Sequence, residues 1–401
     1  MVWSLRLPFS GGGGRTRAPA KPTTQPVEQK ANLPAGLAAL SAGSGASWSG
    51  RSYTALAREG FMRNPVAHRA IRMIAETAAA TPWLLYENER EIDTHPLLDL
   101  LARPNASVSG TEFFETLYGH LLMSGNGWLE AVEGAHGLAG LQLLRPDRVR
   151  VIEGRDGWPV AHEYAVGQAR RRYAIEPVAG RGLLHLRLFH PLDDHAGFAP
   201  LGAAQMALDL HNQASTWNKA LLDNSARPSG ALVYQPKDGG NLTDEQYGRL
   251  KDELEDGYQG ASRAGRPMLL EGGLDWKAMG LSPKDMDFVE ARNGAARDIA
   301  LALGVPPMLI GIPGDLTYAN YQEANRAFCR QTVLPLVART AAAMTNWFRP
   351  VFGGRLRLDF DADRLPGLEA ERDALWKRLS EAPFLNEDEK RQAVGYQPLE
   401  E

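Results

Sequence analysis

The fold follows from residues 281–328, which read Leu281-Ser282-Pro283-Lys284-Asp285-Met286-Asp287-Phe288, then Ala302-Leu303-Gly304-Val305-Pro306-Pro307-Met308-Leu309-Ile310-Gly311, then Thr317-Tyr318-Ala319-Asn320-Tyr321-Gln322-Glu323-Ala324-Asn325-Arg326-Ala327-Phe328. Ser282 is a good helix N-cap, and Pro283 follows it at the first helical position, where a missing N–H costs nothing. Pro306-Pro307 ends that helix, and a short apolar Gly/Pro loop leads to a second long helix. Nothing in the stretch has the pattern of a catalytic site.

Before this stretch, the sequence predicts a further helix and a small β element. Thr243 and Gln246 form a capping box for a helix over residues 243–260. The helix that Ser282 caps is expected to run over residues 282–303. Between these helices, apolar segments 268–271 and 275–279 flank Gly272-Gly273, which predicts a hairpin.

The rest of the chain mixes helices with short strands. Apolar residues recur at helical spacing over residues 64–80, and several short strands follow between residues 83 and 189. A long amphipathic helix is predicted over residues 201–224 and another over residues 317–348. Pro335 is expected to kink the latter, because proline removes one backbone hydrogen bond. The predicted fold class is therefore α+β with a mostly antiparallel sheet.

Composition limits the classes of protein to which the chain can belong. Its 401 residues suffice for two or three domains, and 44% hydrophobic with 23% charged residues is typical of a protein with a packed core. No apolar run approaches the ~20 residues that span a bilayer, and the N-terminus lacks the pattern of a secretory signal. The single cysteine, Cys329, excludes an internal disulfide framework. Assembly in a cytoplasm, without contact with a membrane, is expected.

Charge and the N-terminal composition bear on nucleic acid binding. The net charge is −4 and the Arg and Lys residues are dispersed, which does not favour a protein that grips duplex DNA in a basic groove. Residues 1–48 are rich in Gly, Pro, Ala, Ser and Thr and cannot bury a core, so a flexible arm is expected there. Contact of this weakly basic arm with a neighbouring subunit or with nucleic acid is the alternative.

Enzyme signatures are sparse in the sequence. No lysine follows a glycine, so there is no P-loop, and there is no Gly-x-Ser-x-Gly elbow. The densest group of potential metal ligands is His185, His190, Asp193 and His195. His185 and His190 have opposite parity on a strand and would point to opposite faces. No metal, no cofactor and no catalytic residue is predicted, and a metal-dependent nuclease or hydrolase built on these residues stays as the alternative.

Several motifs, taken in their order, resemble one family. The segments are Asn64–Tyr86, His95-Pro96-Leu97-Leu98 with Arg103-Pro104-Asn105, Gly125-Asn126-Gly127-Trp128, Ala226-Arg227-Pro228-Ser229-Gly230, Gly304–Gly311, and Asn386–Arg391 with Gly395–Pro398. Together they resemble the portal proteins of tailed double-stranded DNA phages, of the siphophage type. The compact form is also compatible with a gene transfer agent.

The resemblance implies an anatomy for the chain. It divides the chain into a flexible arm (1–48), a wing (49–242 and 318–363), two stem helices (243–260 and 282–303), a small β clip (261–281), a tunnel loop (304–317) and a helical crown (364–401). Such subunits assemble head to tail into a closed ring, dodecameric in the family. The implied role is not enzymatic: the ring is the DNA channel of a virion or phage-like particle, at one capsid vertex, for DNA packaging, ejection and head–tail connection.

The resemblance also implies partners and site residues. The expected partners are identical copies, the major capsid protein, the terminase large subunit, the head–tail adaptor and double-stranded DNA passing through. The tunnel loop would consist of Ile310, Gly311, Ile312, Pro313, Gly314, Asp315 and Leu316. Docking of terminase or adaptor would use the clip residues Met268, Leu270, Asp275 and Trp276.

Acidic residues on the stem helices favour a channel through which DNA slides over a site that binds DNA tightly. Repeated around a ring, they would repel phosphate and let DNA slide; the candidates for this wall are Asp285, Asp287, Glu290 and Asp298. An ordinary solvated helix face explains the same charges. For the loop, two glycines, a proline and exposed apolar side chains predict a segment that changes shape cheaply, and a plain connection between helices is the alternative.

Overall fold

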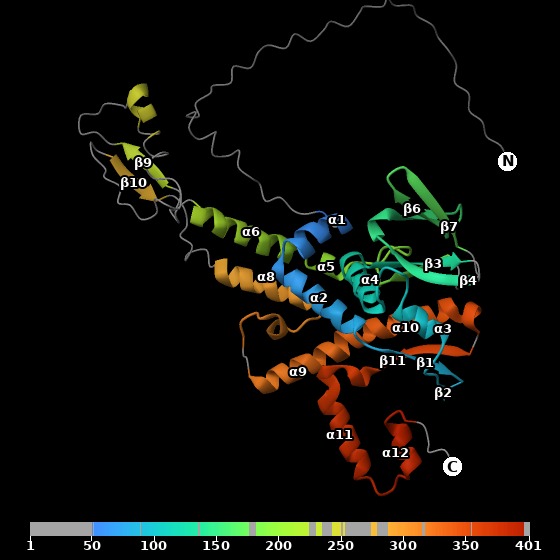
Figure 1. Cartoon of the computed structure of the whole chain (residues 1–401). Helices are drawn as coiled ribbons and strands as arrows, with labels where there is room; N and C mark the ends of the chain where they lie inside the picture. Colours follow the sequence, from blue (N-terminus) through green and yellow to red (C-terminus); the bar gives the residue numbers. More distant parts are fainter. Residues whose placement is uncertain are drawn as a thin grey trace, which may run out of the picture. The chain divides into compact units, whose positions relative to one another are not determined.

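The computed structural model describes residues 50, 52–88, 90–134, 137–175, 182–223, 230–234, 243–249, 252, 274–278, 288–314, 317–353 and 355–396 (Figure 1). These residues belong to the second of two units of the chain, Trp48–Glu401; the first, Met1–Ser47, lies outside them, as does the predicted arm. Helices and antiparallel sheets both contribute, so the predicted α+β class is confirmed.

Two capped helices form the centre of the core. Helix α2 (Pro65–Ala79) is capped by the Asn64 side chain and has Pro65 at its first turn, as the sequence predicts. Helix α4 (Gly110–Ser124) packs against α2 and is capped by Ser109. Their facing sides bury large apolar residues completely: Ile71, Ile74, Leu117, Tyr118 and Leu121. Shorter helices surround them, namely α1 (Tyr53–Ala55), the π-helix η1 (Leu56–Met62) and α3 (Pro96–Ala102).

Three small antiparallel sheets lie beside these helices. One has the order β4-β3-β8, with β3 (Asn126–Gly134), β4 (Gly137–Leu144) and β8 (Leu183–Arg187). A second has the order β5-β6-β7, with β5 (Val149–Glu153), β6 (Pro159–Val166) and β7 (Ala169–Ala174); the 3-10 turn η2 (Pro146–Arg148) leads into it. The third has the order β11-β1-β2, with β1 (Trp83–Glu87), β2 (Arg90–Glu91) and β11 (Leu356–Phe360).

The long helix near the C-terminus is interrupted by one π turn. Helix α9 (Tyr318–Phe328) continues into the π turn η5 (Cys329–Val333) and then into α10 (Leu334–Phe352). Pro335 lies in the first turn of α10, directly after η5. The regular α-helix is therefore broken directly before Pro335, which has no N–H to donate, and the break takes the form of a π turn.

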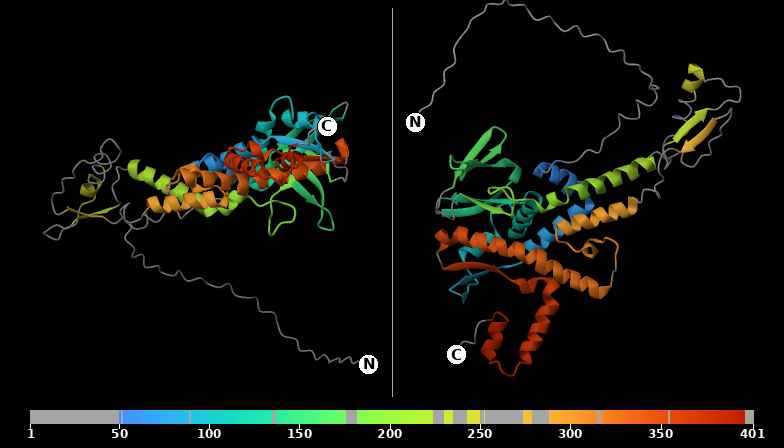
Figure 2. Two further views of the ribbon diagram at one scale, coloured as in Figure 1. Left: turned by 90° about the horizontal axis from the view of Figure 1, so that it is seen from below. Right: turned by 180° about the vertical axis from the view of Figure 1, so that it is seen from behind.

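Helices α6 (Gln205–Asp223) and α8 (Phe288–Ala302) run side by side, as both views in Figure 2 show. The predicted helix over residues 201–224 is found with a break at Ala204, which separates the short helix α5 (Pro200–Ala203) from α6. Strand β9 (Gly230–Tyr234) follows α6 in the chain and pairs with β10 (Leu274–Ala278), which precedes α8. Of the predicted helix 243–260, the structure describes residues 243–249 and 252, with the predicted capping box between Thr243 and Gln246.

Two helices end the described chain. They are α11 (Glu369–Ser380) and α12 (Glu387–Ala393), drawn in red in Figure 1, and they lie in the segment 364–401 that the resemblance implies to be helical. The 3-10 turns η6 (Ala362–Arg364) and η7 (Pro366–Leu368) lead into them, and buried Leu365 and Leu368 join this region to the core. In the part of the chain that the structure describes, no helix is long and apolar enough to cross a membrane.

Candidate functional site

The loop between α8 and α9 begins at a well-formed helix C-terminus. Gly304 has a φ of 70°, the left-handed conformation that favours glycine. The Gly304 N–H donates to the Leu301 carbonyl at 3.0 Å, and the Val305 N–H donates to the Ala300 carbonyl at 2.9 Å. This pair of bonds is the Schellman arrangement, so the exit direction from α8 is fixed by backbone geometry.

The next residues fold back onto α8. The 3-10 turn η4 (Pro307–Ile310) is followed by Gly311 in the left-handed conformation, and the Ile312 N–H donates to the Pro307 carbonyl at 3.1 Å. Ile312 is only 6% exposed and packs against Ala296 and Ala300 of α8. The expectation of exposed apolar side chains is therefore wrong for Ile312, because the reversal at Gly311 returns it to the helix, and Ile310 is half-buried.

Among the described residues of the predicted loop segment 310–316, the exposed ones lie at its tip. Gly311, Pro313 and Gly314 are exposed, and a guanidinium nitrogen of Arg297 donates to the Pro313 carbonyl at 2.9 Å. Asp315 and Leu316 lie outside the described residues. The loop is thus a braced segment with a short exposed tip, rather than a free connection along its whole length.

The predicted acidic wall is incomplete on the described helix. Glu290 and Asp298 lie on α8 and are exposed, as the prediction requires, whereas Asp285 and Asp287 lie outside the described residues. Arg292 and Arg297 are exposed on the same helix, so the described part of α8 carries equal numbers of acidic and basic side chains. An electronegative face would therefore depend on residues before Phe288, which lie outside the described residues. The acidic wall stays a prediction.

The clip residues are placed only in part. Met268 and Leu270 lie outside the described residues, and Asp275 and Trp276 lie on β10. On one edge β10 pairs with β9, and Trp276 lies opposite Leu232. The other arm of the predicted hairpin, residues 268–271, lies outside the described residues, so the hairpin stays a prediction.

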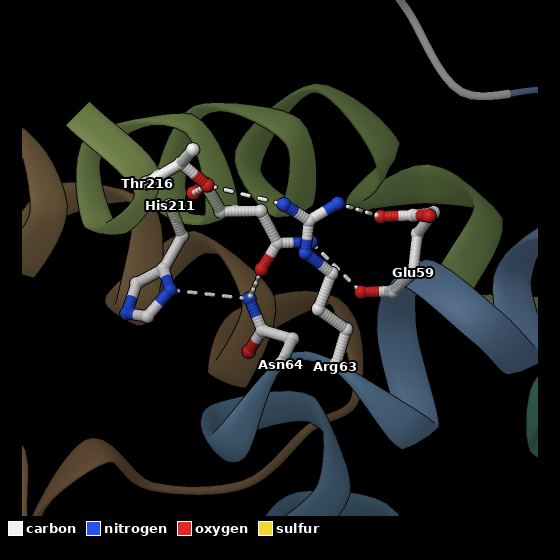
Figure 3. Close-up of polar contacts among 6 residues, drawn as sticks. Glu59, Arg63, Asn64, His211 and Thr216 are labelled. Carbon is white, nitrogen blue, oxygen red and sulfur yellow. Dashed lines mark hydrogen bonds and ion pairs between the residues drawn. The ribbon is translucent and has the colours of Figure 1, made fainter. Parts of the chain in front are cut away.

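A polar network that the sequence did not predict joins α6 to the start of α2 (Figure 3). The Asn64 side-chain carbonyl accepts from the N–H groups of Val66 and Ala67, at 3.0 and 3.1 Å. Its amide group therefore faces α6, where it donates to Asn212 Oδ1 at 3.0 Å and to His211 Nδ1 at 3.2 Å. All four hydrogen-bonding positions of this 1% exposed side chain are used.

The network continues over one more turn of α6. Asn212 donates from Nδ2 to the Glu59 carbonyl at 2.8 Å, and Arg63 bridges Glu59 (2.7 Å) and the Thr216 hydroxyl (3.1 Å). Because Asn64 donates to it, His211 Nδ1 carries no proton, which agrees with the direction of its pKa: burial lowers it, and Arg292 lowers it further. The preference of Asn for an N-cap before proline could have identified Asn64, but no signal in the sequence pointed to α6 as its partner.

The histidine cluster of the enzyme alternative is dispersed. His185 lies on β8, its ring stacked on Trp128 with centroids 3.6 Å apart, and its Nε2 donates to Asn126 Oδ1 at 2.8 Å. His190 Nδ1 accepts from the Leu192 N–H at 3.1 Å, and Asp193 accepts from the N–H groups of the two residues that begin at His195. Throughout the residues that the structure describes, no group of three or more His, Cys, Asp or Glu side chains could hold a metal ion.

Buried neutral histidines are expected to make the fold acid-sensitive. Burial lowers the pKa of His185 to about 3, with help from His162 and Arg187, and lowers that of His120 to about 4. Below about pH 6.5 the unfolded chain binds more protons than the folded one, so stability is complete above that pH and is lost as pH falls toward 4. The expected slope is up to about 1.4 kcal/mol per pH unit for each histidine.

Urea unfolding at pH 7.5, 6.5, 5.5 and 4.5 measures this slope. The variant His185→Gln lacks one titrating ring and is expected to lose stability less steeply over the same range. Equal slopes for the two proteins would contradict the assignment of acid sensitivity to His185.

Comparison with known proteins adds to this geometry. A family model described as "Phage portal protein" matches residues 65–395. A "probable portal protein" of Streptomyces phage phiC31 is 26% identical over 345 residues, which covers 82% of this chain and 74% of that protein.

Three solved structures of gene transfer agent (GTA) particles contain similar chains. One, from the neck of an empty GTA particle computed with C6 symmetry, is 52% identical with a TM-score of 0.71 and covers 90% of this chain and 99% of that one. Another, from the neck of a native GTA particle computed with C12 symmetry, is 51% identical with a TM-score of 0.68 and has the same coverage.

Proposed function

This chain belongs to the phage portal protein family, and from that membership we propose that identical copies form the ring-shaped DNA channel in the neck of a virion or GTA-like particle. The observation that carries the proposal is the similarity along 99% of a chain in a C12-symmetric neck, at 51% identity. Identity at this level over a whole chain supports the same subunit shape, and hence the same contacts between copies. Twelve subunits in a head-to-tail ring is the stoichiometry we propose.

The parts of the ring subunit are proposed as follows. The α/β region before α6, with α9, α10 and β11, is the wing, and α11 with α12 is the crown. For the stem, the sequence prediction paired residues 243–260 with 282–303. The side-by-side packing of α6 and α8 favours these two helices instead, with the β9–β10 pair and the chain between them, including the predicted stem helix at 243–249, as the clip.

The contacts that we propose for this ring follow from these parts. The exposed tip at Pro313 and Gly314 faces the DNA, and the clip meets the terminase large subunit during packaging and the head–tail adaptor afterwards. The wing and crown contact the major capsid protein and the packaged DNA. The role is mechanical, in packaging, ejection and head–tail connection, and no catalytic residue is assigned.

Electron microscopy of the purified full chain, with its mass in solution, tests the ring. We expect rings with a central channel and a mass near twelve times the 43.8 kDa of the chain. A second sample, co-expressed with the capsid protein of the same particle, covers the case in which a partner is needed for closure. A monomer or dimer in both samples, over a range of protein and salt concentrations, would overturn the proposal.

A further inference from the structure

The π turn η5 contacts two regions that are far apart in the sequence. It spans five residues, Cys329–Val333, and the Leu334 N–H donates to the Cys329 carbonyl across it. Cys329 and Val333 are buried in the core, whereas Arg330 is exposed and Thr332 half-buried. Two of its side chains outside the core, Arg330 and Thr332, bond to different neighbours. Single π turns within α-helices often occur at functional sites.

On one side, η5 holds the first turn of the crown helix α11. Arg330 Nε donates to both carboxylate oxygens of Glu371, at 2.8 and 3.0 Å, and Arg326 approaches the same carboxylate at 3.6 Å. The ion pair lowers the pKa of Glu371. The root of the crown also touches the turn, since a methyl group added at Gly367 would lie 2.7 Å from Cys329 Sγ. The crown therefore cannot shift here without moving residues at the turn.

On the other side, η5 holds the start of the tunnel loop. The Thr332 hydroxyl donates to the Gly304 carbonyl at 2.5 Å. Gly304 is the left-handed residue that fixes the exit from α8, and a methyl group there would lie 2.8 Å from Thr332 Oγ1. The loop from Val305 to Ile312 then continues through the bonds described above. A change in the position of Thr332 therefore acts on Gly304, which sets the direction in which the loop leaves α8.

The turn is also the part of the long helix that bends at least cost. Pro335 has no N–H for the Gln331 carbonyl, so a regular α-helix cannot complete its hydrogen bonds here. A π turn holds one residue more than an α turn, and its conversion would rotate one flanking helix relative to the other by about 100°. Arg330 and Thr332 could not keep both partners through such a change. Conversion of the π turn would therefore disturb both contacts at once.

We propose, resting on the portal function proposed above, that η5 couples the crown to the tunnel loop. A displacement of α11, such as DNA or a partner pressing on the crown would cause, acts through Glu371 and Arg330 on the turn, and through Thr332 on Gly304. Arg330 and Thr332 are positioning residues in this device, because neither lies at the exposed tip of the loop. The loop would then respond to the state of the crown, which lies at the other side of η5.

Hydrogen exchange of the full chain, followed by mass spectrometry, tests the coupling. In Glu371→Gln, which removes the charge but keeps the size of the side chain, we expect backbone N–H groups of residues 304–314 to exchange at least three-fold faster. Glu369→Gln is the matched control: both residues are acidic and lie in the first turn of α11, so loss of helix-dipole support is the same in both. The control is expected to leave exchange in the loop unchanged.

A double variant tests whether the two contacts lie on one route. Thr332→Val removes the hydroxyl at nearly constant size and is expected to raise exchange in the loop directly. If the coupling is real, adding Glu371→Gln to Thr332→Val has little further effect. Loop exchange in Glu371→Gln within 1.5-fold of wild type, or effects that multiply in the double variant, would overturn the proposal.

This readout is independent of ring formation. If rings form normally but Glu371→Gln does not change hydrogen exchange in the loop, the coupling is wrong and the portal function stands. If Glu371→Gln speeds exchange in the loop but the chain never forms rings, the coupling through η5 is supported and the portal function is contradicted.

Discussion

Replacing Gly197 by alanine is expected to prevent stable folding of the α/β region before α6. A methyl group at this position would lie 1.9 Å from the Gly125 carbonyl oxygen, 2.6 Å from the carbonyl carbon and 2.9 Å from the Leu188 nitrogen. All three atoms belong to the backbone, so no side chain can rotate away. The Leu188 N–H also donates to the Gly125 carbonyl at 2.8 Å, and this bond would have to break. We expect the free energy of unfolding to fall by more than about 4 kcal/mol, the range reached only by severe structural conflicts.

A second glycine provides the control for this variant. Gly202 lies in α5, and a methyl group there would meet its nearest neighbours at 3.6 to 3.8 Å, which is ordinary contact. Gly202→Ala is therefore expected to change stability by no more than about 1 kcal/mol. Urea unfolding and the soluble yield of both variants measure the difference. Equal unfolding midpoints would show that the chain can relax around Gly197 and would contradict the expectation.

The contact between Gly125 and Gly197 illustrates what the sequence could and could not predict. Gly125-Asn126 was recognisable as a turn before a strand, and Gly125 indeed has a φ of 75° at the end of α4. Its partner Gly197 lies in a loop far along the chain, where the Asn126 side chain accepts from its N–H at 2.7 Å. Local signals such as caps and turns are encoded within a few residues. The pairing of two loops is decided by packing, which one sequence does not display.

The same distinction applies to the stem helices, where our proposal departs from the sequence prediction. The capping box at Thr243 and Gln246 was predicted correctly, because a cap depends only on nearby residues. Which helix lies against α8 depends instead on complementary buried faces, and these belong to α6. The resemblance had implied residues 243–260 as a stem helix, and its acidic charges say nothing about its neighbour, because acidic helices are usually no more than solvated.

The loop shows a similar limit on predicting a site. Its glycines and prolines marked the connection between two helices, and the boundaries are close to those observed. Burial of Ile312 could not be predicted, because it depends on the reversal at Gly311 bringing the side chain back onto Ala296 and Ala300. The coupling role of η5 had one visible signal, Pro335, which predicted a disturbance but neither its form nor its partners.

The second large effect is expected at Asn64, the residue that both caps α2 and bonds to α6. Asn64→Ala removes an N-cap, worth about 1 kcal/mol, and leaves His211 Nδ1 and Asn212 Oδ1 without their donor inside the protein. Each buried polar atom without a partner costs roughly 1 to 3 kcal/mol. We expect a loss of about 3 to 5 kcal/mol in urea unfolding at pH 7.5. Ser109→Ala, which removes the exposed cap of α4, is the control and should cost only about 1 kcal/mol.

Asn64→Asp separates the cap from the bond to α6. Aspartate still accepts from the N–H groups of Val66 and Ala67, but it places a negative charge opposite His211 Nδ1 in place of a donor. A carboxylate there favours the protonated imidazole and raises the pKa of His211, which burial and Arg292 lower in the wild type. The stability deficit of Asn64→Asp relative to wild type should therefore shrink between pH 7.5 and 5.5, as His211 takes up its proton. The deficit of Asn64→Ala should shrink less, since alanine loses only the bond to the neutral imidazole and offers the imidazolium no partner. Comparison with wild type at each pH cancels the acid sensitivity of the other histidines. If both deficits stayed constant with pH, the bond between Asn64 and His211 would not contribute to the joint between α2 and α6.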